Sequence, residues 1–172
     1  MPLITEDGTG LSDSESYASV SYADIYHYNR GNSDWAALVT SVIEQYLRKS
    51  TDYLLQKYRA SWKGFRLLDT QALDWPRDGV YIDNAVLVAD DVVPIEVQRS
   101  CCELALRNTD GELLEDSGGR LTTKAKVDVI EVEYSEQSTM NADTKYNSID
   151  KMLQPYLDSS SVAGIMGRID RA

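Results

Sequence analysis

Histidine and cysteine are scarce in this chain, and their scarcity limits the chemistry that it can perform. One of the 172 residues is histidine and two are cysteine. His27 alone cannot supply a histidine-based catalytic triad or a conventional zinc site. Cys101 and Cys102 are adjacent in a helical pattern, where a structural disulfide rarely forms, so we expect reduced thiols. Walker-type and dinucleotide-binding glycine motifs are also missing. We therefore expect no enzyme activity, no cofactor and no metal site.

Long apolar segments are missing too. No apolar run approaches the roughly 20 residues that cross a bilayer. Residues 1–7 lack the basic stretch followed by an apolar one that marks a secretory signal. We therefore expect no membrane partner, and the chain length indicates one domain with a real core.

Positive charge is in short supply. The chain has 17 lysines and arginines against 28 aspartates and glutamates, which gives a net charge of −11. A DNA-binding protein gains affinity by neutralising phosphates with basic side chains, so the average charge disfavours DNA binding. A local basic patch is still compatible with the sequence, because Arg59, Lys63, Arg66 and Arg77 lie near two tryptophans. An acidic wall would also suit a channel through which DNA slides.

Apolar residues at helical spacing predict most of the domain. The clearest signal begins at Ser41, a good N-cap with Glu44 three residues later, and continues to Tyr58. A shorter helix should follow an N-cap at Ser21, and Pro94 suits the first position of another. The predicted helices are 22–30, a turn at 34–38, 41–58, 94–108 and 146–157, the last ended or bent by its proline.

A long connection separates the helices at 41–58 and 94–108. It contains Trp62, and then Trp75 before a proline that favours extended backbone. The two indoles either pack back onto the helix as loop anchors or stack on nucleobases. Short apolar stretches within residues 80–88 are expected to pair locally as strands.

Residues 126–134 are rich in β-branched side chains and predict a strand, with 120–125 as its hairpin partner. We therefore predict a mainly α fold: a small helical bundle with a short β hairpin and extended termini. The predicted organisation is a flexible N-terminal arm at 1–16, a helical domain at 17–157 with the hairpin near 120–134, and a C-terminal tail at 158–172.

Several motifs resemble one known family. They are Ser50-Thr51-Asp52-Tyr53-Leu54, Trp62-Lys63-Gly64, the T-x-A-L-x-W-P-R segment at 70–77, the helix at 94–106, and the opening at 6–11 with Glu15-Ser16-Tyr17. Together they resemble a family of small tailed-phage proteins labelled DnaT-like single-stranded-DNA-binding proteins. That family also resembles the head-to-tail connector, or adaptor, proteins that form a ring beneath the phage portal.

The adaptor resemblance implies a structural virion protein. It would sit at the head–tail interface of the virion, after assembly in the host cytoplasm, as a homo-oligomer in a dodecameric ring. Its partners would be the portal protein and a tail or head-completion protein, and genomic DNA would pass through its channel without specific binding. The tail, which lacks anchors to fold alone, would dock on the portal. Its docking residues would be Ile165, Met166, Arg168, Ile169 and Arg171.

The other resemblance implies a single-stranded-DNA-binding accessory protein of replication. Trp62 and Trp75 would then stack on bases while Arg66 and Arg77 contact phosphates. The sequence alone leaves these four residues open between this role and that of loop anchors.

Overall fold

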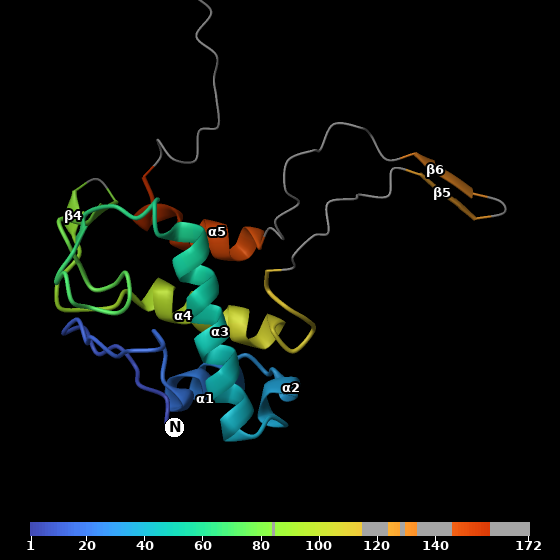
Figure 1. The fold of residues 1–172 in the computed structure, drawn as a ribbon, viewed down its shortest axis with the longest axis horizontal. Helices are drawn as coiled ribbons and strands as arrows, with labels where there is room; N and C mark the ends of the chain where they lie inside the picture. Colours follow the sequence, from blue (N-terminus) through green and yellow to red (C-terminus); the bar gives the residue numbers. More distant parts are fainter. Residues whose placement is uncertain (84, 115–123, 128–129, 134–145, 159–172) are drawn as a thin grey trace, which may run out of the picture. The chain divides into compact units, whose positions relative to one another are not determined.

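The computed structural model describes residues 1–83, 85–114, 124–127, 130–133 and 146–158 (Figure 1). The chain divides into two compact units, residues 1–113 with 146–172, and residues 114–145. The described helices are α1 (Val20–Tyr28), α2 (Ser33–Ala36), α3 (Thr40–Tyr58), α4 (Ile95–Arg107) and α5 (Asn147–Leu153), and a 3₁₀ turn, η1 (Gln154–Tyr156), follows α5. The described strands pair as β1 (Phe65–Arg66) with β2 (Arg77–Asp78), β3 (Tyr81–Ile82) with β4 (Val86–Leu87), and β5 (Lys124–Val127) with β6 (Ile130–Glu133), all antiparallel. The fold is mainly helical with small hairpins, as predicted.

The core of the first unit is built on α3, with α4 crossing it (Figure 1). The predicted apolar stripe of α3 is buried, with Leu47 and Leu54 fully enclosed. Val97 and Leu104 of α4 are also fully enclosed. Each such side chain contributes roughly 1.5–3 kcal/mol by leaving water, so this helix pair supplies much of the stability.

The helix starts differ from the predicted ones. Helix α1 begins at Val20, because the Ser19 hydroxyl rather than that of Ser21 accepts a hydrogen bond from a free backbone N–H, that of Tyr22, at 3.2 Å. Helix α3 begins at Thr40 after an extended residue without a side-chain cap, so the capping pair predicted at residues 41 and 44 is not formed.

Residues 1–16 were predicted to form an arm, but in the structure they pack against the domain. The Glu6 carboxylate is buried and accepts hydrogen bonds from the backbone N–H groups of Gly8, Gly10 and Leu11 and from the Ser14 hydroxyl, at 2.9–3.0 Å. A Cβ at position 8 would lie 2.0 Å from the carbonyl oxygen of Asp91, so this loop closes tightly on the connection before α4.

The long connection between α3 and α4 is held by an aromatic cluster. The Trp75 ring meets Trp62 edge-on at 5.7 Å and Tyr156 edge-on at 5.6 Å, and Tyr58 lies 5.7 Å from Trp62. Trp75 has no exposed surface, and the peptide bond that follows it is cis. Tyr156 is fixed in turn by donating to the Glu96 carboxylate at 2.6 Å. Trp75 thus contacts η1 directly, and the cluster extends through Trp62 to Tyr58 on α3 and through Tyr156 to Glu96 on α4.

Local strand pairing within 80–88 is confirmed by β3 and β4, whereas the pairing of β1 with β2 was not predicted. The second unit contains the β5–β6 hairpin, in register from Lys124 opposite Glu133 to Val127 opposite Ile130. Among the described residues, no helix has both the length and the apolar character of a membrane span.

Replacing Trp75 with alanine should lower the free energy of unfolding by about 3–5 kcal/mol, because it leaves a cavity next to the Trp62 and Tyr156 rings. Urea denaturation followed by circular dichroism measures this loss. Trp75→Phe keeps a ring and removes an indole N–H that has no hydrogen-bond partner among the described residues, so it should lose less. Equal losses in the two variants would contradict the packing role of the ring.

His27 should make the protein less stable in mild acid. Its imidazole is enclosed and hydrogen-bonded to the Cys102 carbonyl at 3.1 Å, and burial lowers its pKa below the ordinary value of 6.5. The Cys102 bond and the carboxylates of Glu103 and Asp24 oppose this shift, and Arg30 adds to it. Below pH 6.5 the unfolded chain takes up a proton that the folded chain excludes, so stability falls by up to about 1.4 kcal/mol per pH unit.

Urea midpoints measured between pH 7 and pH 5 test this expectation. His27→Gln should show a shallower decline over the same range, although it will be less stable overall. A decline of the same slope in both proteins would assign the pH dependence to other groups.

Candidate nucleic-acid interface

The surface around β1 and β2 gathers several of the residues that the sequence singled out. Phe65 pairs with Asp78 and Arg66 with Arg77 across this short hairpin. Gly64 precedes it with a φ of +66°, and a Cβ there would lie 2.2 Å from the Asp78 carbonyl oxygen. Only glycine fits this approach, so the Trp-Lys-Gly sequence fixes where the hairpin begins.

Arg77 lies beneath this surface rather than on it. Its guanidinium donates from Nε to the Lys63 carbonyl at 2.7 Å, from Nη2 to that of Gly64 at 2.7 Å and from Nη1 to that of Asp74 at 3.2 Å. The side chain is buried, and burial lowers the pKa of the guanidinium, with Asp74 acting in the opposite direction. Arg77 therefore stabilises the loop, and each of its three guanidinium nitrogens already donates to a backbone carbonyl.

Trp62 and Trp75 are also unsuited to stacking on a base in this structure. Trp62 is 5 % exposed and Trp75 is 0 % exposed. Base stacking needs an open ring face. The burial of both rings in the aromatic cluster fits the role of loop anchors.

Arg59 and Arg66 are exposed at the same surface. Arg59 donates from Nε to Asp74 Oδ1 at 3.1 Å, yet 59 % of its side chain remains exposed. Arg66 donates from Nη2 to the Gln71 carbonyl oxygen. Each guanidinium carries five N–H donors, so both keep donors that can reach a phosphate.

Phe65 is the residue that sequence reasoning missed. It is the single phenylalanine of the chain, and 79 % of it is exposed. It lies with Arg59, Arg66 and Arg77 around a surface pocket of about 370 Å³ that Asp69 and Asp74 complete. The sequence Lys63-Gly64-Phe65-Arg66 places an aromatic residue near two basic ones, which could have identified Phe65. The prediction named the two tryptophans as stacking residues instead.

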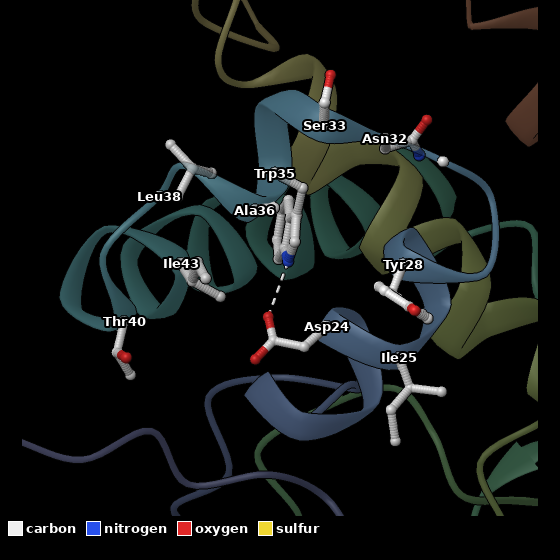
Figure 2. Close-up of a pocket in the computed structure, with 11 residues that line it drawn as sticks. Asp24, Ile25, Tyr28, Asn32, Ser33, Trp35, Ala36, Leu38, Thr40 and Ile43 are labelled. Atoms are coloured by element: carbon white, nitrogen blue, oxygen red, sulfur yellow. Dashed lines mark hydrogen bonds between the residues drawn. The ribbon is translucent and has the colours of Figure 1, made fainter.

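A second and larger pocket lies elsewhere, between α1, α2 and the start of α3 (Figure 2). It has a volume of about 650 Å³, and none of its lining residues is lysine or arginine. This pocket lacks the positive charge that a phosphate backbone requires. The β1–β2 surface is thus the better candidate for nucleic acid.

Comparison with known proteins finds one protein family whose model matches the whole chain. The model of a protein family, described as "Putative DnaT-like ssDNA binding protein", matches residues 1–172. The chain belongs to this family. Searches of curated proteins and of solved structures found no match.

The family match corrects the main functional prediction. The family is described by single-stranded DNA binding, and no comparison links the chain to a phage connector. The prediction of a head-to-tail adaptor that forms a ring beneath the portal is therefore wrong, and so is the description of the chain as a virion connector. The sequence motifs identified the family correctly. The resemblance of that family to connector proteins was too general to assign a role to this chain.

The residues predicted to dock on the portal lie outside the described part of the chain. These are Ile165, Met166, Arg168, Ile169 and Arg171. The structure brings Trp62, Arg66, Trp75 and Arg77 into one region, of which Arg66 is the exposed member.

Replacing Arg77 with alanine should lower the free energy of unfolding by about 1–3 kcal/mol, because carbonyl groups that it satisfies lose a buried partner. Arg77→Lys should recover little of this loss, since one ammonium cannot span three carbonyls. Chemical denaturation of the two variants and the parent chain measures both effects. A fully stable Arg77→Ala protein that has lost DNA affinity would instead identify Arg77 as a direct contact.

Proposed function

We propose that the chain binds single-stranded DNA at the β1–β2 surface, with Phe65 as the stacking residue and Arg59 and Arg66 as phosphate contacts. The observation that carries the proposal is the Phe65 ring, 79 % exposed beside two exposed guanidiniums. The family description supports the choice of ligand.

Stacking suits a ligand whose sequence varies. Every base has a flat π face, and stacking on an aromatic side chain contributes about 1–3 kcal/mol per base. In a duplex the bases stack on one another, so an exposed ring on a protein surface meets a base face mainly in a single strand. Phe65 therefore favours single-stranded over double-stranded DNA.

The charges around Phe65 make this a small interface. Asp69 and Asp74 line the same pocket as Arg59 and Arg66, and the whole chain carries a net charge of −11. Nucleotides beyond the pocket would meet repulsion rather than attraction. We expect each copy to hold a short piece of strand, with weak affinity and little gain from longer oligonucleotides.

Phe65→Ala should weaken binding to a fluorescein-labelled oligothymidine by about 5- to 150-fold, which corresponds to the loss of one stacked base. Fluorescence anisotropy at low salt measures the affinity. Phe65→Trp should retain binding because it keeps a π face. Tyr28→Ala removes a similarly exposed aromatic ring on α1, which does not line the pocket at Phe65, and should leave the affinity unchanged.

The salt dependence gives a second readout from the same titration. Two phosphate contacts predict a slope of about −1.4 for log K against log salt concentration. Arg66→Gln should make the slope about half as steep. No binding by the parent chain at low salt, or equal losses in Phe65→Ala and Tyr28→Ala, would refute this interface.

A further inference from the structure

The pocket between α1, α2 and α3 is an apolar cleft with a fixed floor. Trp35 and Ile43 are nearly enclosed there, while Ile25 and Tyr28 at the rim are 62 % and 84 % exposed. Figure 2 shows the Trp35 ring standing in the cleft, with Nε1 donating to Asp24 Oδ1 at 2.9 Å. Large apolar side chains gathered in a cleft of about 650 Å³ mark a place where another segment binds.

The charge of the cleft indicates which kind of segment could bind in it. Asp24 lines it, Asp34 lies on α2 beside Trp35, and no lining residue is basic. A fitting segment therefore carries large apolar side chains together with arginine or lysine. A nucleic acid strand does not meet this description.

Residues 165–171 of this chain have that composition. Their sequence is Ile-Met-Gly-Arg-Ile-Asp-Arg, with three large apolar residues and two arginines in seven positions. Basic residues outnumber acidic ones here, although the whole chain has 28 acidic residues against 17 basic ones. The segment is thus complementary to the cleft in both apolar character and charge.

The distance that the chain must span from Asp158 bears on whether residues 165–171 bind in the cleft of their own copy or in that of another. Asp158, the last residue described before the segment, donates its N–H to the Ser61 carbonyl at 2.8 Å, just beyond the end of α3. The cleft lies at the other end of α3, at Ile43. At 1.5 Å per residue the helix alone separates Ile43 from Tyr58 by about 22 Å.

Ile165 follows Asp158 by seven residues, which reach at most about 25 Å when fully extended. To bring Ile165 to the cleft of its own chain, these residues would have to run almost fully extended along the whole of α3. The cleft of a second copy therefore places less demand on the path between Asp158 and Ile165 than the cleft of the same chain does.

We propose that residues 165–171 of one copy dock in the α1–α2 cleft of a second copy. Ile165, Met166 and Ile169 would cover Ile25 and Tyr28, and the arginines would face Asp24 and Asp34. Each copy gives one segment and receives one, so the exchange can close between two copies or continue around a ring. This proposal is independent of DNA binding, because it uses neither Phe65 nor the basic residues near it.

Site-directed disulfide formation tests the contact. One chain carries Tyr28→Cys, a second chain of different mass carries Ile169→Cys, and the mixture is oxidised with copper phenanthroline. The native thiols, Cys101 and Cys102, are buried and should not react. We expect a linked pair that contains one chain of each kind on a non-reducing gel. The control replaces Tyr28→Cys with Gln56→Cys, an exposed position on α3, and should give little product.

The same experiment can overturn the proposal. Equal linking of the Gln56 control would show random collision. A double variant with both Tyr28→Cys and Ile169→Cys that closes a disulfide within one chain would place the segment in its own cleft. Either result contradicts exchange between copies.

Sedimentation velocity of the full chain over a range of concentrations gives an independent measure. Ile169→Asp should weaken self-association by about 10- to 100-fold, as expected for one buried apolar side chain. Phe65→Ala should leave self-association unchanged. A parent chain that stays monomeric at every concentration would refute the proposal and assign the cleft to a different partner.

Discussion

The packing of Trp75 between Trp62 and Tyr156 is the constraint on which the rest of the first unit depends. The described part of the segment between α3 and α4 has only short strands, and the ring joins this segment to η1 through Tyr156. Arg77 completes the arrangement by donating to three backbone carbonyls of the same segment. With its backbone held from below, the segment can present Phe65 at the surface without burying it.

This arrangement divides the aromatic residues by role. The tryptophans provide buried area, where their size is most effective, while the smaller Phe65 ring remains in water next to Arg59 and Arg66. An exposed ring adds little to folding, and the proposed interface gives it a role in binding. The acidic surroundings would keep the affinity of the proposed site low.

The sequence was sufficient to predict the helices, because their apolar residues recur at a regular spacing. Apolar spacing placed α3 and α4 within a residue or two, because burial of one helix face imposes a period that can be counted. It placed the cap of α1 at Ser21 when the structure has Ser19, because serine suits either position and only backbone geometry separates them. It also could not separate the buried Trp75 from the exposed Phe65, because both lie among basic residues in a long connection. The partners of Arg77 are backbone carbonyls, which leave no trace in the sequence.

The most direct measurement uses the fact that the chain contains one phenylalanine. Protein labelled with fluorophenylalanine should give a single ¹⁹F resonance that reports on Phe65. We expect this resonance to shift and saturate when a short oligothymidine is added at low salt, and to return when salt is raised. A resonance that does not move while oligonucleotide binding is detected by another method would show that DNA binds elsewhere, and the account of the β1–β2 surface would be wrong.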